Sequence, residues 1–313
     1  MEFPAFHERE GSVMKIIYSL KTIFMNIKII KVFFAMTFAV FMAGCSKEEN
    51  PGSFNTEAII VDHNSTKLSS VPSEWIDKAK EMLHIAYGHT SHGSQLTEGM
   101  SGLVSFKGTE FKWNNGGTNG ALDLRDYAMS GDLGNPDRTS WAQRTRTYLD
   151  EHPEINVIIW SWCGQVSTAT EADIDTYLTL MEDLERNYPD VRFVYMTGHL
   201  DGTGLTGNLH LRNEQIRNFC KANNKVLYDF ADIETYNPDG AYFGSKKPND
   251  ACDYDSNNDG TRDSNWAVEW QNSHRQGVDW FNCTAAHTQP LNANMKAYAA
   301  WWLWARLAGW DGK

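Results

Sequence analysis

The sequence is short of basic residues. It contains 28 Lys and Arg against 40 Asp and Glu in 313 residues, a formal net charge of −12. Binding to a nucleic-acid backbone needs a basic surplus that displaces counterions, so this balance argues against such a partner. The chain also lacks internal repeats and low-complexity tracts, and its 41% hydrophobic content is not that of a disordered tail. This composition predicts one large folded domain or two small ones.

The amino-terminal region has no hydrophobic run that spans a membrane comfortably. Its apolar stretch, Val32 to Ala43, follows Lys28 and Lys31 and is followed by small residues and Cys45. A membrane span needs about 20 apolar residues, whereas a basic, then apolar, then small-residue order is typical of a secretory signal peptide. We therefore expect residues 1–44 to be a signal peptide, with Met25 as an alternative true start.

The end of this segment resembles the lipobox of bacterial lipoproteins. It reads Met42-Ala43-Gly44-Cys45, with Met where Leu is usual. The resemblance implies that Cys45 is lipidated and anchors the chain to the outer membrane. The acidic cluster in 46–50 resembles the surface-export signal of Bacteroidetes lipoproteins, which implies exposure at the cell surface. The alternative to the signal peptide is a transmembrane anchor, and the alternative to the export signal is a plain solvated segment. In either case we expect residues 45–70 to form a tether.

Cysteine is scarce, with five in the chain. If Cys45 is lipidated, four remain for the folded part. Cys252 and Cys283 lie in Asp- and Asn-rich, loop-like sequence and are the better candidates for a disulfide in an oxidising compartment. The spacing alone does not establish that pairing.

Strand-like and helix-like segments alternate through residues 71–313, the expected domain. The continuous apolar run at 156–160 is typical of a buried parallel strand. Further strands are expected at 84–87, 191–196 and 225–230, and helices at 73–83, 140–151, 171–186, 211–222 and 292–307. Such alternation predicts an α/β domain whose mostly parallel sheet is covered on both faces. Two long irregular insertions are expected at 93–138 and 231–286.

The residues that follow each expected strand are the candidates for chemistry, because ligands of parallel sheets bind beyond the carboxyl ends of the strands. Ser91 follows the first strand, where the N–H groups of a helix amino terminus can stabilise an oxyanion. Gly164 and Gln165 follow the second strand and offer further donors. His287 precedes the final helix and can serve as general base to the serine. A Ser- and Gly-rich turn without chemistry and a structural histidine are the alternatives.

This order resembles the SGNH (GDSL-type) hydrolases over residues 84–308. The resemblance implies a flavodoxin-like three-layer α/β/α fold and a serine esterase. In that esterase Ser91 is the nucleophile, Gly164 and Gln165 supply oxyanion donors, and His287 is the base. His89, Trp162 and His199 are then the candidate substrate-binding residues.

The chain departs from the family pattern at three places. It lacks Gly-Asp-Ser, so Thr90 is an alternative nucleophile, and Gln165 stands where the family has Asn. Thr284 stands where the family has an Asp three residues before the histidine. Asp279 is the candidate orienting carboxylate; otherwise a backbone carbonyl orients the base of a dyad.

The expected substrate is a carbohydrate ester, which the surface signal and the twelve Trp residues favour, although aromatic content mostly reflects packing. One alternative is a metal-dependent hydrolase that uses His89, His92 and His199. Its further candidate ligands are His210, His274, His287 and Asp201. The other alternative is a non-catalytic glycan-binding lipoprotein. No organic cofactor is expected, and the oligomeric state stays open.

The segment 253–263 predicts a structural calcium site. Its oxygen-bearing side chains alternate ahead of Gly260 in the D-x-[DN]-x-[DN]-G pattern that wraps a hard cation. Trp266 stands where an EF-hand has its bidentate Glu, so the segment resembles shorter bacterial calcium loops, with Glu269 as a candidate to close the shell. A solvated acidic turn is the alternative. The expected ligands are Asp253, Asp255, Asn257, Asp259 and Asp263.

Lipidation of Cys45 is directly testable. Metabolic labelling with a fatty acid should mark the wild-type chain and should be lost in Cys45→Ala, because only the thiol can carry the diacylglyceryl group. Cys220→Ala is the matched control and should keep the label. Equal labelling of the wild type and of Cys45→Ala would contradict the assignment.

Calcium should raise the melting temperature, because an ion that binds only the native state stabilises it by about 2.7 kcal/mol at 100 times its Kd. The measurement compares melting in calcium with melting in chelator. The response should vanish in Asp255→Ala/Asp259→Ala and persist in Asp175→Ala/Asp190→Ala, a change of equal charge outside the loop. A calcium response that survives in the loop variant rejects the site.

Overall fold

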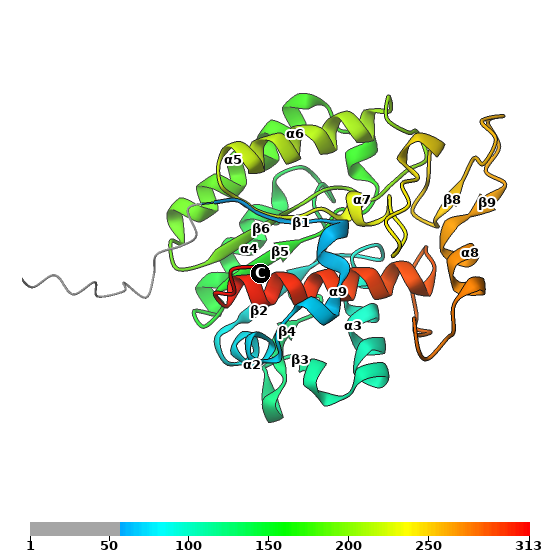
Figure 1. Ribbon diagram of the computed structural model, residues 1–313. Coiled ribbons are helices and arrows are strands. Elements are labelled where there is room, and N and C mark those ends of the chain that lie inside the picture. Colours follow the sequence, from blue (N-terminus) through cyan, green and yellow to red (C-terminus); the bar gives the residue numbers. More distant parts are fainter. Residues whose placement is uncertain (1–56) are drawn as a thin grey trace, which may run out of the picture. The chain divides into compact units, whose positions relative to one another are not determined.

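Short apolar strands form an all-parallel, seven-stranded sheet in the computed structural model, which describes residues 57–313 (Figure 1). Helices cover both faces of the sheet, so its strands are apolar on both sides; all four residues of the Val-Ile-Ile-Trp strand β5 are buried. The strands are β1 (Ile59–Val61), β2 (His84–Gly88), β3 (Trp113–Asn114), β4 (Leu122–Arg125), β5 (Val157–Trp160), β6 (Arg192–Met196) and β7 (Val226–Tyr228).

The strand order is β1-β7-β6-β5-β2-β4-β3, and every neighbouring pair is parallel. Its inner part, β4-β2-β5-β6-β7, has the 2-1-3-4-5 order of flavodoxin-like sheets. The chain therefore leaves β2 in one direction toward β4 and returns to the other side of β2 as β5. The prediction of a flavodoxin-like α/β/α fold is confirmed.

The helices lie in two layers (Figure 1). Helices α2, α3 and α9 pack together on one face of the sheet, and α4, α5 and α6 on the other. A small antiparallel hairpin of β8 (Asp253–Tyr254) and β9 (Ser264–Asn265) stands apart from the main sheet. The helices are α2 (Ser73–Met82), α3 (Ser94–Lys107), α4 (Ser140–Glu151), α5 (Glu171–Asn187), α6 (Asn208–Ala222), α7 (Phe230–Ile233), α8 (Trp266–Ser273) and α9 (Pro290–Leu307).

Helix α5 shows how the sequence specifies these elements. Thr170 and Asp173 form a capping box that satisfies the first backbone N–H groups of the helix. The helix ends at Asn187, two residues before Pro189, which cannot continue it. Its buried face consists of Ile174, Tyr177, Leu178, Met181 and Leu184, at the spacing of one helical face.

Two of the expected boundaries are wrong. Residues 59–61 belong to the sheet, where β1 pairs with β7, so the domain includes residues assigned above to the tether. The insertion expected at 93–138 contains helix α3 and the strands β3 and β4. Strand β4 is hard to recognise because it carries a buried Asp123, which pairs with Arg125 and lies 2.9 Å from His84. The second insertion, 231–286, is irregular apart from α7, the β8–β9 hairpin and α8.

The cysteine prediction is also wrong, because all four cysteines within residues 57–313 are free. The Cys252 sulfur lies 3.4 Å from the Thr288 hydroxyl, and the Cys283 sulfur lies 3.5 Å from the Asn294 amide. The expected signal peptide, Cys45 and the expected tether as far as residue 56 lie outside the described residues. Within 57–313, no helix has the length and apolarity needed to cross a membrane.

A buried ion pair lies between the sheet and α9. Lys296 of α9 donates to Glu234 at 2.6 Å and to the side chain of Gln95, and neither Lys296 nor Glu234 is exposed to solvent. Burial lowers the pKa of Lys296, and the neighbouring Glu234 carboxylate opposes that effect. Glu234 also accepts the backbone N–H of Leu200 at 2.8 Å, so the pair connects α9 to the segment after β6.

Replacing Lys296 should strongly destabilise the protein. In Lys296→Met, Glu234 remains buried without its cation, which costs about 3–5 kcal/mol, and thermal or urea unfolding measures the loss. Lys67→Met, at an exposed lysine, should change stability by less than about 0.5 kcal/mol. Lys296→Met/Glu234→Gln should recover part of the loss, since the amide oxygen still accepts from Leu200. A single variant as stable as the control would show that the pair is not needed.

Candidate functional site

Polar side chains gather where β2 and β5 end, at the point where the chain changes direction across the sheet. The two strands are neighbours, and the backbone N–H of Ser161, after β5, donates to Gly88 O at the end of β2. The turn after β2 brings Ser91 and His92 beside Cys163 from the turn after β5. Such a switch point is the usual ligand-binding position of an open parallel sheet.

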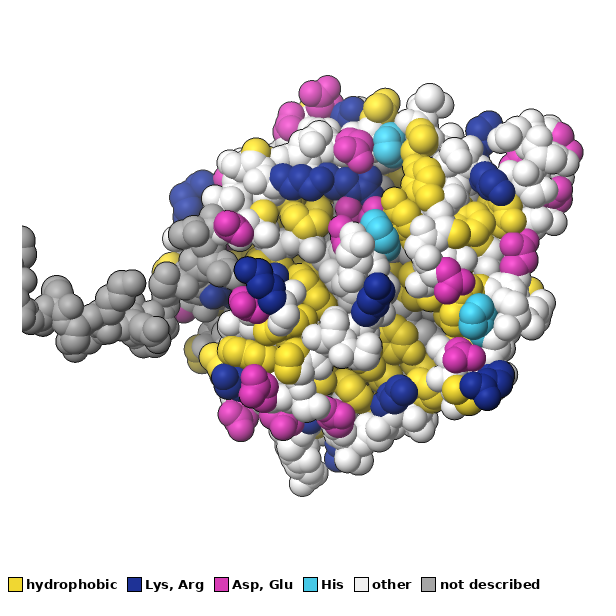
Figure 2. Space-filling view, viewed as in Figure 1, with side chains coloured by type: hydrophobic (Ala, Val, Ile, Leu, Met, Phe, Trp, Pro, Cys, Tyr) yellow, Lys and Arg dark blue, Asp and Glu magenta, His cyan; other side chains and the backbone are white. Residues whose placement is uncertain are grey.

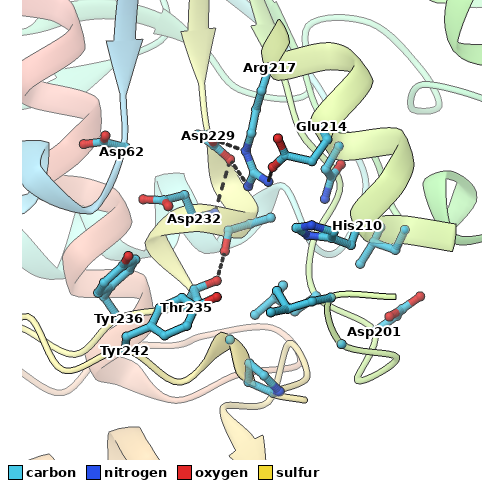
Figure 3. A pocket seen from close by; sticks show the side chains of 18 of the residues that line it. Asp62, Asp201, His210, Glu214, Arg217, Asp229, Asp232, Thr235, Tyr236 and Tyr242 are labelled. Atoms are coloured by element: carbon cyan, nitrogen blue, oxygen red, sulfur yellow. Dashed lines mark hydrogen bonds and ion pairs between the residues drawn. The ribbon is translucent and has the colours of Figure 1, made fainter. Parts of the chain in front are cut away.

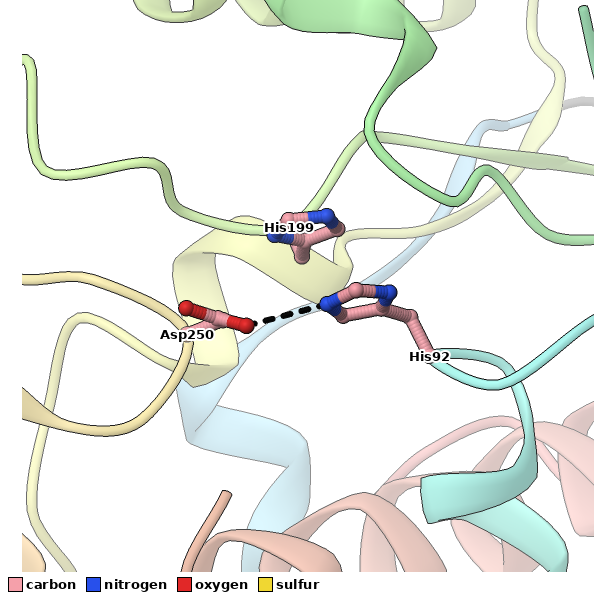
Figure 4. A group of neighbouring side chains, drawn as sticks. All are labelled: His92, His199 and Asp250. Atoms are coloured by element: carbon pink, nitrogen blue, oxygen red, sulfur yellow. Dashed lines mark hydrogen bonds and ion pairs between the residues drawn. The ribbon is translucent and has the colours of Figure 1, made fainter. Parts of the chain in front are cut away.

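Cys163, His92 and Asp250 form a hydrogen-bonded chain. The Cys163 sulfur lies 3.0 Å from His92 Nδ1, and His92 Nε2 lies 2.9 Å from an oxygen of Asp250 (Figure 4). His92 is buried, whereas Cys163 and Asp250 are partly exposed. A thiol, an imidazole and a carboxylate thus stand in the same order as the groups of a catalytic triad, which is recognised by geometry rather than by position in the sequence.

Charge interactions shift the pKa values of all three groups toward their ionised forms. The hydrogen bond from His92 lowers the pKa of the Cys163 thiol and outweighs burial, which raises it. Burial lowers the pKa of His92, but the bonds to Asp250 and Cys163 outweigh it and raise that pKa to about 9. Burial raises the pKa of Asp250, and the bond from His92 brings it below its usual value. The arrangement therefore favours a thiolate beside an imidazolium.

Two further imidazoles contact His92. His199 stacks on it with ring centroids 3.7 Å apart and planes 2° from parallel, and His287 stacks at 4.3 Å and 16°. His199 Nδ1 faces the Leu200 carbonyl oxygen at 3.0 Å, which leaves Nε2 buried and without a partner among the described residues. Burial lowers the pKa of His199. A neutral His199 can therefore lie against a charged His92.

His92, His199 and Asp250 are also the residues here that could hold a metal ion, since their ligand atoms lie within 4.8 Å of one another (Figure 4). Zinc binds imidazole nitrogen at about 2.0–2.1 Å, along the lone pair in the ring plane. Two parallel stacked rings cannot both point at one ion in this way, so one ring would have to turn. The ion would also replace the bond between His92 and Asp250. The geometry as it stands fits the thiol better than a metal.

Gln165 does not point its amide at the site opening. Its oxygen accepts the Cys163 backbone N–H at 2.9 Å, and its nitrogen donates to Asp132 at 2.9 Å. The other Asp132 oxygen accepts the Thr90 hydroxyl at 2.5 Å. This chain of bonds ties the Cys163 turn to the turn after β2, so Gln165 and Thr90 serve there as structural links and not as a free oxyanion donor and a free hydroxyl. Burial raises the pKa of Asp132.

The expected pair of Ser91 and His287 does not form. The Ser91 hydroxyl lies 3.8 Å from the Cys163 sulfur. His287 is exposed, has a positive φ of 64°, and makes no hydrogen bond to any described residue. Asp279 accepts the Arg275 backbone N–H instead of orienting a histidine. The structure nevertheless brings Ser91, His287 and Gly164 to the rim of the same site, around Cys163.

Two expected substrate-binding residues lie in the interior. Trp162 is buried and donates from its indole nitrogen to Met196 O at 2.9 Å. His89 is buried between Tyr87 and Tyr127, with its ring nitrogens on Asp126 at 2.7 Å and on Thr90 O at 2.9 Å. Neither side chain is free to meet a ligand, and of the three only His199 lies at the site.

The predicted calcium loop forms a turn held by its own carboxylates. Asp255 accepts the backbone N–H of Gly260 at 2.9 Å and of Asp259 at 3.2 Å, and Asp263 accepts from Ser256. Asp253 instead faces the Asn265 amide. Burial raises the pKa of Asp255, but the backbone donors outweigh it and lower that pKa. Calcium binding here stays a prediction.

Sequence reasoning named His92 only as a metal ligand and did not assign a role to Cys163. A thiol three residues after a buried strand, followed by glycine, is the signal that could have pointed to Cys163. Asp250 carried no comparable signal, because it comes from the long irregular segment 158 residues after His92 in the chain.

No family model matches the chain, and neither a curated protein nor a solved structure matches it at the level of significance applied. The site must therefore be interpreted from its own geometry. On the face of the described residues shown in Figure 2, basic side chains lie among acidic and apolar ones rather than in one patch.

Proposed function

We propose that the protein is an acyl hydrolase in which Cys163 is the nucleophile, His92 the general base and Asp250 the residue that orients the imidazole. The observation that carries the proposal is the continuous chain of contacts, 3.0 Å from thiol to imidazole and 2.9 Å from imidazole to carboxylate. The lowered pKa of Cys163 supports it, because the thiolate is the reactive form of cysteine.

The reaction proceeds in two halves. The Cys163 thiolate attacks the ester carbonyl carbon, a C–S bond forms, and the carbonyl electron pair moves onto oxygen. The pair then returns, the C–O bond to the leaving alkoxide breaks, and His92 gives its Nδ1 proton to that oxygen. Water attacks the resulting thioester while His92 takes its proton, and the thiolate leaves as the acid is released.

Backbone N–H groups are the donors available to the oxyanion. Gly164 is exposed, lies next to Cys163, and its N–H has no acceptor among residues 57–313. The Cys163 N–H is already taken by Gln165. The Gly164 N–H is therefore the donor available next to Cys163, and the Ser91 hydroxyl, 3.8 Å from the sulfur, is a second candidate.

The proposal keeps the substrate class and location expected from the sequence. Esters of carbohydrate, met outside the cell by a chain anchored through Cys45, remain the proposed substrates. The polar surroundings of Cys163 and the exposed histidine at its rim suit a hydroxyl-bearing leaving group. Ser91 as nucleophile, a metal ion on His92 and His199, and glycan binding without turnover are the alternatives that the experiments below distinguish.

Alkylation tests the thiolate directly. Iodoacetamide should modify Cys163 at pH 6.5 much faster than an ordinary thiol, whose pKa of about 8.5 leaves roughly 1% ionised there. In the wild type, the alkylation rate plotted against pH should have its midpoint below about 8.5, the pKa of an ordinary thiol. In Asp250→Asn the midpoint should rise, because the imidazolium loses its partner. Cys283, whose pKa burial raises to about 12, is the internal control and should stay unmodified. A Cys163 midpoint near 8.5 would argue against the pair.

Turnover of p-nitrophenyl acetate tests the roles. Cys163→Ala and His92→Gln should each lower kcat by at least about 10³-fold, because each removes a group that acts in the bond-breaking step. Cys283→Ala should change kcat little, and Ser91→Ala less than about tenfold. Activity should fall as pH rises through about 9, where His92 loses its proton. Full activity in Cys163→Ala, with a fluorophosphonate adduct on Ser91 or Thr90, would assign a serine-type or threonine-type enzyme. Loss of wild-type turnover on addition of a chelator, with full turnover in Cys163→Ala, would indicate a metal-dependent enzyme.

A further inference from the structure

A second cavity lies at the same edge of the sheet, beyond the ends of β1 and β7. Its volume is about 460 Å³, within the range of small-molecule sites. It is bounded by α6, by the segment after β6 and by the turn after α7 (Figure 3). Cys163, His92 and Asp250 do not line it.

A short backbone pairing separates this cavity from the triad. Asp201 and Asn249 form an antiparallel bridge, and Asp201 lines the cavity while Asn249 directly precedes Asp250. His199 lies two residues before Asp201, on the triad side. The cavity is therefore a separate compartment, and what it binds does not depend on how Cys163 acts.

The lining of the cavity carries an excess of negative charge. Five acidic residues line it against two basic ones, Arg217 and Lys221. Arg217 is not available to an anionic ligand, because its guanidinium makes bonds of 2.6 and 2.7 Å to Asp229 and of 2.8 Å to Glu214. Lys221 is exposed to solvent. The acidic residues without a basic partner from Arg217 or Lys221 are Asp62, Asp201 and Asp232. Asp201 accepts hydrogen bonds from Ser167 and Thr203, which are neutral donors and leave its negative charge in place.

Those three carboxylates are spread out rather than convergent. In Figure 3 Asp62 and Asp232 lie on one side of the cavity and Asp201 on the opposite side. Asp232 binds His63 at 2.5 Å through one oxygen, which leaves its other oxygen without a partner among the described residues. Asp62, His63 and Asp232 each offer a ligand atom, and these atoms lie within 4.8 Å of one another. The His63 Nδ1 already bonds Asp232, and the His63 ring stacks on Tyr236 with centroids 3.6 Å apart, so the histidine would have to give up both contacts to turn toward an ion. This geometry does not favour one small metal ion.

Aromatic rings line the wall next to the carboxylates. Tyr236 and Tyr242 form a tilted pair with centroids 5.2 Å apart, and Tyr242 is 45% exposed. A ring face attracts an ammonium group that has left part of its water behind. Carboxylates at both ends with aromatic rings beside them make a site for a ligand that is cationic at its ends and apolar between them.

We propose that this cavity binds an aliphatic diamine or polyamine. One ammonium group pairs with Asp62 and Asp232 and contacts the Tyr236–Tyr242 pair. The methylene chain crosses the cavity, and the second ammonium group pairs with Asp201. Two charges at a fixed separation distinguish such a ligand from a monoamine, which can satisfy only one end.

Calorimetric titration of the full chain with putrescine and spermidine tests the proposal. Both should bind at least tenfold more tightly than butylamine, and 1,4-butanediol, which has the length but not the charge, should not bind. Affinity should fall as salt is raised, because the pairing is between charges. Cys163→Ala should bind as the wild type does, so failure of the hydrolase proposal leaves this result unaffected.

Two variants locate the ligand. Tyr242→Ala, at a position that is 45% exposed, and Asp232→Asn should each weaken putrescine binding at least fivefold, with circular dichroism and melting confirming the fold. Asp190→Asn, an exposed acidic residue outside the cavity, is the matched control and should bind normally. Equal loss in the control, no loss in Tyr242→Ala, or tighter binding of Mn²⁺ or Ca²⁺ that excludes putrescine would overturn the proposal.

Discussion

The buried pair of Lys296 and Glu234 is the constraint on which the site depends. A buried lysine can stay charged only when an opposite charge and hydrogen-bond acceptors compensate it. Here the Glu234 carboxylate and the Gln95 side-chain amide compensate the Lys296 ammonium. Each partner then reaches a loop: Glu234 holds the Leu200 N–H, and Gln95 donates to Ala286 O. One charge on α9 thereby fixes the segments that carry His199 and His287 and the first turn of α3.

The same constraint explains why three histidines can stack in so small a space. His199 follows Met196 at the end of β6, and His287 follows Ala286, which is clamped by Gln95 and by Glu98. His92 lies against both rings. A charged His92 is tolerated beside the stacked His199 because burial lowers the pKa of His199 and because the Asp250 carboxylate faces His92. The fold thus influences the charge state of His92 as well as its place.

Local patterns predict four of the seven strands, β2, β5, β6 and β7, but not β1, β3 and β4, nor the side chains that meet at the site. The Val-Ile-Ile-Trp run of β5 and the capped α5 carry their signals within a few residues, and both appear where expected. Strand β4 was missed because its buried Asp123 reads as polar, although Arg125 and His84 satisfy it. At the site, residues after β2 and β5 lie side by side, but Ser91 and His287 make no hydrogen bond to each other. Asp250 becomes the partner of His92 only through tertiary packing of an irregular segment, which no short pattern encodes.

Ser91 and Cys163 differ in whether the side chain contacts the imidazole of His92. The contact between Asp250 and Nε2 fixes the orientation of the His92 ring. The other ring nitrogen, Nδ1, then faces the Cys163 sulfur at 3.0 Å. The Ser91 hydroxyl lies 3.8 Å from the same sulfur, and His287 makes no hydrogen bond to it. A hydroxyl without a base keeps its proton at neutral pH, whereas a thiol beside an imidazolium gives it up. The serine-like order of the sequence and the cysteine-like geometry of the fold are compatible if Ser91 acts as a hydrogen-bond partner of the Cys163 sulfur, which lies 3.8 Å from its hydroxyl.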